Sequence, residues 1–271
     1  KDIEPYLNGL SGIYCPETGL IDYKSVCNKL SEKIKEKNEI NTSEKVVKIF
    51  SINKEITIVS EKKDYTARFL INCAGLFSDQ VAKLAGVTRE ARIVPFRGEY
   101  YMLKSKSHHL VKNLIYPVPD PAYPFLGVHF TRTINGGIEA GPNAVLAWAR
   151  EGYKKSDINL IEIFDYLSYS GFWRMTRKYW ATGMAEYYRS FFKFGFVKAL
   201  QKLIPDITAN DIDASPSGVR AQALGCDGKL IDDFLFKVKN NMIHVINAPS
   251  PAATSSLAIA EHIEKIFSKN S

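Results

Sequence analysis

The sequence predicts a mixed α/β protein with two domains of different texture. Towards both ends of the 271-residue chain, apolar strands alternate with helices, whereas residues 92–143 alternate apolar and polar side chains and contain several prolines. Alternating strands and helices are typical of α/β sheets, and a period of two is typical of antiparallel strands. We therefore expect a discontinuous α/β domain formed by residues 22–90 and 216–271, and an antiparallel domain formed by residues 1–21 and 91–215.

The first third of the chain predicts short strands around one helix. Residues 9–21 have the composition of two strands joined by a turn. A helix is expected after Asp22, because apolar residues recur every four positions at Val26, Leu30 and Ile34. Three β-like runs follow, separated by short polar connections that suit hairpins: residues 46–50, 56–59 and 65–72.

Residues 69–86 have the order strand, small residues, helix. A buried strand from Phe69 to Cys73 is expected to run into Ala74 and Gly75. The helix that follows is expected to be capped by Ser78 and closed by Gly86, with Val81, Leu84 and Ala85 on its inner face. In α/β sheets this order builds an edge that contacts nucleotides.

Residues 153–204 predict helices that are rich in aromatic side chains. Core packing and a domain lid are the main interpretation of these rings, and contact with a membrane is the alternative. The aromatic residues concerned are Phe164, Tyr166, Phe172, Trp173, Tyr179, Trp180, Phe191 and Phe192.

The last part of the chain returns to strands and a helix. Asp227 and Gly228 indicate a hairpin within residues 216–236. A strand over residues 242–246 is followed by a proline-bracketed loop and by a helix that we expect to start near Ala252. The buried side of this helix is predicted to carry Leu257, Ala260, Ile263 and Phe267.

Charge and cysteine content exclude several classes of protein. The net charge is +7, but the lysines are interleaved with glutamates along helical segments and no nucleic-acid-binding motif accompanies them. We therefore expect no nucleic-acid partner. The four cysteines lie far apart and form no CxxC pair, so we expect core-filling residues, no metal site, no disulfide framework and a reducing cytoplasm.

The segment IHVINAPSPAATSS is the first candidate for a binding site. Asn247, Ser250 and Thr254 lie with small residues at a helix N-terminus, where free backbone N–H groups favour an anionic oxygen. Small residues also let the backbone approach a flat ring closely. The alternative is an ordinary helix start with Thr254 or Ser255 as its cap.

Two arginines are placed in apolar strands. Arg220 needs a partner there, which is either a protein carboxylate, at Asp232 or Asp233, or the carboxylate of a substrate. Arg97 interrupts another apolar run and is open to the same two interpretations, with Glu99 or Asp120 as its structural partner.

One of the five histidines, His129, lies in an apolar strand-like run. A histidine with a pKa near 6.5 can accept the hydroxyl proton of an alcohol that is being oxidised. A satisfied core histidine is the alternative, and the other four histidines are expected to serve the surface or packing.

Seven strings occur in order along the chain: NCAGLFSD, VPFRGEYYML, LIYPVPDPAYPFLGVHFTR, GPNAVLAWAREGY, PSGVRAQAL, DGKLIDDFLF and HVINAPSPAATSS. Together they resemble the L-2-hydroxyglutarate dehydrogenase/oxidase family of the FAD-dependent, D-amino-acid-oxidase-like superfamily. The resemblance implies an FAD-binding Rossmann-type domain beside an antiparallel substrate domain. It also implies oxidation of L-2-hydroxyglutarate to 2-oxoglutarate by hydride transfer to the flavin.

The resemblance also assigns residues. Substrate contacts fall on Arg97, Tyr116 and Arg220, which suit a small dicarboxylate, and His129 is the candidate base. Contacts to FAD fall on Val46 near the adenine, on Ala74 and Gly75 near the pyrophosphate, and at the flavin ring on Asn247, Ser250, Ala252, Ala253 and Thr254.

One part of the family pattern is absent from these residues. Family members carry a strand and a GxGxxG turn that hold the pyrophosphate, and neither glycine-rich segment here follows that strand-to-helix plan. We therefore expect an incomplete FAD-binding domain that alone binds FAD weakly or not at all, and that can regain activity with a separate amino-terminal segment. A catalytically dead fragment, and a flavin glycerol-3-phosphate or amino-acid oxidase, remain as alternatives. A cytoplasmic location, with peripheral membrane contact left open, completes the prediction.

Overall fold

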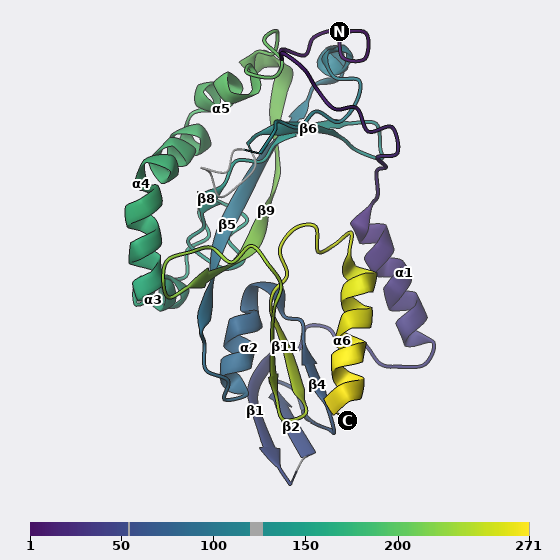
Figure 1. Cartoon of the computed structure of the whole chain (residues 1–271), viewed down its shortest axis with the longest axis vertical. Helices are drawn as coiled ribbons and strands as arrows, with labels where there is room; N and C mark the ends of the chain where they lie inside the picture. The colour runs from purple at the N-terminus through teal and green to yellow at the C-terminus, as the bar shows by residue number, and fades with distance from the viewer. Residues whose placement is uncertain (54, 120–126, 271) are drawn as a thin grey trace. The chain divides into compact units, whose positions relative to one another are not determined.

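The computed structural model describes residues 1–53, 55–119 and 127–270 (Figure 1). The chain forms two compact units. Unit 1 comprises residues 1–22, 95–163 and 176–220, and unit 2 comprises residues 23–94, 164–175 and 221–271. Residues 164–175 were expected in the antiparallel domain but lie in unit 2, where Asp165 binds Arg89 and Arg92.

Unit 1 is built on the long strand β5 (Ala91–Leu103), whose first four residues belong to unit 2. The sheet has the order β6-β7-β5-β8, and β9 also pairs with β5. The pairs of β5 with β7 and β8, and of β6 with β7, are antiparallel, so the predicted antiparallel sheet is confirmed. The other strands are β6 (His129–Arg132), β7 (Ile138–Gly141), β8 (Val145–Leu146) and β9 (Ile212–Gly225).

One face of this sheet carries the main core of unit 1. Phe130 of β6 and Ala140 of β7 are fully buried there, and Tyr101 of β5 packs against them with Phe196 of helix α5 (Lys193–Leu200). Because side chains alternate along a strand, the neighbours His129 and Tyr100 belong to the opposite face. Two 3₁₀ helices, Ser105–Leu110 and Ala209–Asp211, border this core.

The predicted helices of residues 153–204 are α3 (Leu160–Leu167), α4 (Ser170–Phe191) and α5. The backbone of α4 leaves helical geometry at Tyr179, which divides the helix in two. Tyr166 and Phe172 are buried as expected, and Tyr179 is half-buried. Core packing is wrong for the remaining five rings, which are largely exposed: Phe164, Trp173, Trp180, Phe191 and Phe192. No described helix combines the length and apolarity needed to cross a membrane.

Unit 2 contains an antiparallel sheet in which β1 (Val46–Ile52), β2 (Glu55–Ser60) and β3 (Asp64–Ala67) follow one another. The run 65–72, predicted as continuous, is two strands, because its second half pairs with a different sheet as β4 (Leu70–Asn72). Helix α2 (Ser78–Leu84) packs Val81 and Ala85 onto this sheet and buries Ala82, but Leu84 is partly exposed.

The second sheet of unit 2 has the order β10-β11-β4. Strand β10 (Leu235–Lys239) is antiparallel to β11 (Met242–Asn247), and β11 is parallel to β4. Among the described strands β4 is an edge strand, and its Ile71 is 48% exposed rather than buried.

Helix α6 (Ser256–Asn270) starts four residues later than predicted, because residues 251–255 form turns closed by backbone bonds such as Ser255 N–H to Pro251 O. Its buried side carries Ile259, Ile263, Ile266 and Phe267, whereas Leu257 is 70% exposed. Ile263 and Phe267 were expected there, and Leu257 and Ala260 are corrected to exposed positions.

Several apolar segments lack the burial that the sequence pattern predicts. Helix α1 (Tyr23–Lys35) forms as expected but contains no buried residue. Residues 9–21 form one turn and no strand, since no described strand pairs with them. All four cysteines are exposed rather than core-filling, because they lie on α1 or in loops and turns: Cys15, Cys27, Cys73 and Cys226.

Two phenylalanines of α5 provide a matched test of this core. Phe196 is fully buried and Phe194 is 62% exposed, two positions away on the same helix. We expect Phe196→Ala to lower the free energy of unfolding by about 3–5 kcal/mol, because it removes a buried ring and leaves a cavity. Phe194→Ala should lower it by less than about 0.5 kcal/mol. Urea unfolding followed by circular dichroism measures both values, and equal losses would contradict the described core.

Candidate functional site

The candidate cofactor residues lie in unit 2 where two parallel strands end. Strands β4 and β11 run side by side, with His244 opposite Asn72, so the segments that follow them leave the same edge of the sheet. Ligands of α/β sheets bind at such carboxyl ends. Ala74 and Gly75 follow β4, and the loop from Ala248 to Ser255 follows β11.

Buried hydrogen bonds fix the ends of β4 and β11 and the segments that follow them. The Asn72 amide donates to Ser78 O and lies 3.1 Å from His244 Nδ1, and its oxygen accepts the Ala74 N–H. Ser78 was predicted to cap α2, but its Oγ donates to Ile246 O of β11 instead. Gly86 closes α2 with φ +73°, as predicted.

Asn247 is buried, and its side chain is fully engaged with the protein. Its amide donates to Ile231 O and Asp233 O at 2.9 and 2.8 Å, and its oxygen accepts the Ala223 N–H. Asn247 therefore shapes the loop that follows it. Within that loop Ser250, Ala253 and Thr254 are exposed and Ala252 is half-buried.

The exposed part of this edge fits a flat, partly anionic group. Gly75 has φ +53°, and a Cβ placed on it would meet no atom within 4 Å, so the backbone is open to close approach there. The Thr254 hydroxyl bonds the Tyr23 hydroxyl at 2.9 Å rather than an N–H group of α6. Val46 is half-buried at the start of β1, where it packs against the core of that sheet.

The candidate substrate residues lie in unit 1. The rings of Tyr116 and His129 are stacked at 4.1 Å, and the Tyr116 hydroxyl bonds Thr131 Oγ1 at 2.9 Å. His129 and Thr131 belong to the face of β6 opposite the buried Phe130. The structure thus brings Tyr116 and His129 together on the face that the core leaves open.

The state of His129 suits proton acceptance. Its Nδ1 lies 3.1 Å from Gly127 O, so in the neutral ring Nδ1 carries the proton and Nε2 keeps a lone pair. Desolvation by burial lowers the pKa of His129, and the positive charge of Arg220 lowers it further, although the Gly127 bond opposes the shift. The imidazole is therefore neutral near pH 7.

Arg220 of β9 is linked to this group through Tyr100 of β5. The Arg220 guanidinium bonds the Tyr100 hydroxyl and is also attracted by Glu186. Burial lowers the pKa of Arg220 and raises that of Tyr100, so the arginine faces a neutral hydroxyl as its bonded partner. Pairing of Arg220 with Asp232 or Asp233 stays a prediction.

Sequence reasoning missed Tyr100. It adjoins Tyr101 in the string VPFRGEYYML, and only the register of β5 shows which of the two rings enters the core.

Arg97 is only 3% exposed, and protein acceptors occupy its donors. Nε and one terminal nitrogen donate to Glu99 Oε1 at 3.1 and 3.0 Å, and the other terminal nitrogen donates to Gly152 O and Lys154 O. Glu99 also accepts from Ser190 and Asn143. These contacts favour the structural interpretation of Arg97, and the other expected partner, Asp120, lies outside the described residues.

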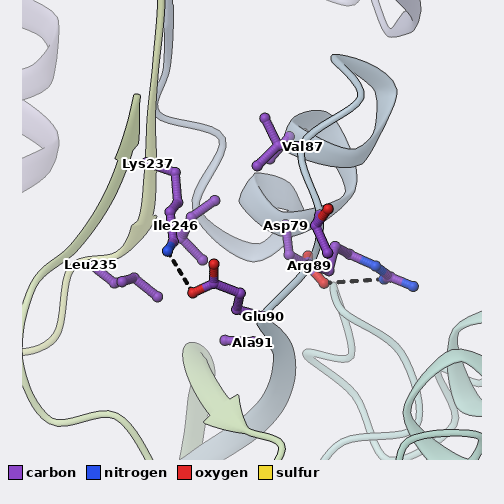
Figure 2. A pocket seen from close by; sticks show the side chains of 10 residues that line it. Asp79, Val87, Arg89, Glu90, Ala91, Leu235, Lys237 and Ile246 are labelled. Atoms are coloured by element: carbon purple, nitrogen blue, oxygen red, sulfur yellow. Dashed lines mark hydrogen bonds and ion pairs between the residues drawn. The ribbon is translucent and has the colours of Figure 1, made fainter. Parts of the chain in front are cut away.

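A narrow pocket in unit 2 contains none of the predicted site residues. Figure 2 shows Asp79, Arg89, Glu90 and Lys237 at its walls. Each of these charges is paired: Arg89 with Asp79 and Asp165, and Lys237 with Glu90. The described residues contain no group of His, Cys, Asp or Glu side chains arranged to hold a metal ion.

Comparison with known proteins decides the family. Residues 1–266 match the family model described as FAD dependent oxidoreductase. The chain belongs to this family. The family is that of FAD-dependent enzymes, so the predicted fold class and the expectation of FAD as the cofactor type are confirmed at the level of the family.

Similar curated proteins carry one name. The chain is 51% identical to an L-2-hydroxyglutarate dehydrogenase of Indibacter alkaliphilus, over 96% of the chain and 65% of that relative. It is 43% identical to the mitochondrial L-2-hydroxyglutarate dehydrogenase of Homo sapiens, over 96% of the chain and 60% of the relative. The predicted family resemblance is therefore confirmed, and the chain spans less than two-thirds of the length of these relatives.

Solved structures share the fold at low identity. One is the FAD-bound L-alpha-glycerophosphate oxidase of Mycoplasma pneumoniae, with a TM-score of 0.64 and 17% identity over 90% of the chain and 55% of that structure. Another is an L-proline dehydrogenase of P. horikoshii, with a TM-score of 0.57 and 11% identity over 91% of the chain and 55% of that structure.

The buried His244 makes stability depend on pH. Its side chain is fully buried, and among the described residues Nε2 has no hydrogen-bond partner. Desolvation, followed by the charge of Lys239, lowers its folded pKa below the ordinary value. The unfolded chain therefore binds the proton first, and stability is lost as the pH falls through about 6.5.

We expect His244→Phe to reduce the slope of the free energy of unfolding against pH, between pH 7 and pH 5, by up to about 1.4 kcal/mol per pH unit. His129 keeps its own contribution, because its pKa is lowered too. Urea unfolding across this pH range measures the slope, with the exposed His262→Phe as control. An unchanged slope in His244→Phe would show that His244 does not titrate differently in the two states.

Proposed function

We propose that this chain forms the substrate-binding part and one edge of the cofactor site of a flavoenzyme that oxidises L-2-hydroxyglutarate to 2-oxoglutarate. The observation that carries the proposal is the grouping of a neutral histidine, two tyrosines and a desolvated arginine in unit 1. The names of the similar curated proteins supply the substrate.

The chemistry assigned to these side chains follows from their state. His129 Nε2 accepts the proton of the C2 hydroxyl, because the neutral ring has its lone pair there. The Arg220 guanidinium, whose planar fork can hold a carboxylate through two hydrogen bonds, binds a carboxylate of the substrate. Tyr116 lies against His129 and holds its ring in place.

Bound FAD would supply the acceptor for the hydride that leaves C2. In unit 2, Ala74 and Gly75 and the loop with Ser250, Ala252, Ala253 and Thr254 would hold it, because they are small and mostly exposed at the carboxyl ends of β4 and β11. Asn247 would hold the loop in shape from beneath, and Val46 would lie beside the adenine.

The cofactor site also needs a second polypeptide segment, separate or in the same chain. Strand β4 has a free edge among the described strands, with Ile71 48% exposed, and α1 buries no side chain. An open apolar edge of this kind favours pairing with a further strand. We infer that a segment with a strand and a GxGxxG turn pairs with β4 and binds the FAD pyrophosphate.

Complementation tests this inference. The chain is co-expressed with a polypeptide that carries the strand and GxGxxG unit of a relative, and flavin absorbance is measured in the co-purified material. We expect flavin to be retained by the pair and to be largely absent from the chain alone. A charged edge variant, Ile71→Lys, should reduce retention, whereas Ile52→Lys on β1, exposed to 61%, should leave it unchanged. A pair without flavin would refute the inference.

Turnover of the completed enzyme tests the roles of His129 and Arg220. His129→Asn should lower kcat by about a hundredfold or more, since general bases contribute 10²–10⁴-fold. Arg220→Lys should mainly raise KM, by roughly tenfold. The exposed His109→Asn serves as control. Faster oxidation of glycerol 3-phosphate or of an amino acid than of L-2-hydroxyglutarate would favour the alternative oxidases.

A cytoplasmic location and contact with a membrane surface belong to the same proposal. The four cysteines are free and exposed, which suits a reducing compartment. The exposed rings of the α4 region support the membrane contact.

A further inference from the structure

Helices α4 and α5 follow one another along the chain (Figure 1), and the second half of α4 and the start of α5, both in unit 1, carry several exposed apolar residues. Four of these residues recur every three or four positions, so they share one face of the helix. We call this surface the aromatic face, and its members are exposed by 51–67%: Trp180, Met184, Tyr188, Phe191, Phe192 and Phe194.

Other residues of the same helix make polar contacts with the rest of unit 1. The Glu186 carboxylate accepts the Ala144 N–H, and the Tyr187 hydroxyl donates to Leu146 O of β8. Ser190 is buried and donates to Glu99 of β5. This half of α4 is therefore inverted relative to a surface helix of a soluble protein, which turns its apolar side inward.

Positive charge surrounds the aromatic face. Residues 176–202 contain six basic residues and one acidic residue, Glu186. Glu186 is paired with Arg189, and the Lys193 ammonium donates to Ile212 O. The outward positive charge therefore comes from the four exposed basic residues, Arg177, Lys178, Lys198 and Lys202. Two ammonium groups lie over rings of the face, Lys155 over Phe191 at 5.3 Å and Lys198 over Phe194 at 5.4 Å. The basic residues are Arg177, Lys178, Arg189, Lys193, Lys198 and Lys202.

Two partners could cover the aromatic face, a second copy of the chain or a lipid surface, and its positive charge favours one of them. A second copy of the chain, paired by two-fold symmetry, would set two positive surfaces against each other. An anionic lipid surface complements both features, because aromatic side chains favour the interfacial region and lysine and arginine attract acidic headgroups. The described helices are not suited to cross a bilayer, so the contact is peripheral.

We propose that the aromatic face of α4 and α5 docks the protein onto a membrane containing anionic lipid, with the rings at the headgroup boundary and the basic residues at the phosphates. This deepens the membrane contact proposed above and identifies the surface that makes it. Lipid binding needs neither flavin nor substrate, so the test of lipid binding is independent of the test of the oxidation chemistry.

Vesicle sedimentation of the purified chain tests the docking. Vesicles of phosphatidylcholine alone are compared with vesicles that also contain phosphatidylglycerol, at low and high salt. We expect binding to the mixed vesicles that weakens with salt. The double variant Trp180→Ser/Phe191→Ser should partition at least about tenfold less, because both rings leave the lipid boundary. Since both residues are exposed, the variant should keep its fold, which circular dichroism checks.

A matched control replaces two exposed apolar residues elsewhere in unit 1, Val118→Ser/Ile134→Ser, and should bind as the unchanged chain does. In a chain that keeps only Trp180 as tryptophan, brominated lipid should quench its fluorescence. Vesicle binding that is unaffected by the double variant would overturn the proposal. So would absence of binding, or a dimer in analytical ultracentrifugation that the double variant dissociates while vesicles fail to bind.

Discussion

The alternation of side chains across the antiparallel sheet of unit 1 is the constraint on which the candidate substrate site depends. The same strands bury Phe130 and Tyr101 on one face and present His129 and Tyr100 on the other. A shift of β6 by one residue would exchange these faces, exposing a phenylalanine and burying a histidine without its Gly127 bond. The core therefore fixes the register, and the register fixes the chemistry.

In unit 2 the constraint is that the parallel strands β4 and β11 end at the same edge of the sheet. The Asn72 amide meets His244 and Ser78, and the Ser78 hydroxyl meets Ile246 O, so each exit is tied to the other by buried hydrogen bonds. Broken bonds of this kind are expensive because no water replaces them. These buried hydrogen bonds fix the backbone beneath the small exposed residues that follow β4 and β11. The resulting surface is ordered and accessible, as binding of a planar ligand requires.

The sequence predicted what depends on local pattern. Period-two alternation revealed the strands of unit 1, and the order strand, small residues, helix revealed the exit of β4. It failed where burial depends on a partner. Residues 9–21 and three of the rings of α4, Trp173, Trp180 and Phe191, have the pattern of buried elements, yet they are largely exposed in the described chain. Arg97 and Arg220 look alike in sequence, but only packing shows that one is saturated by Glu99 and backbone oxygens and the other bonds a neutral phenol.

The inverted half of α4 changes how substitutions there will be tolerated. In an ordinary surface helix the outward positions tolerate most substitutions, and the inward positions require apolar side chains. Here the inward positions need specific donors and acceptors, as Glu186 and Ser190 do, so even an apolar residue of equal size is a poor replacement. The outward rings are exposed, so their replacement by polar residues is expected to change the free energy of unfolding little.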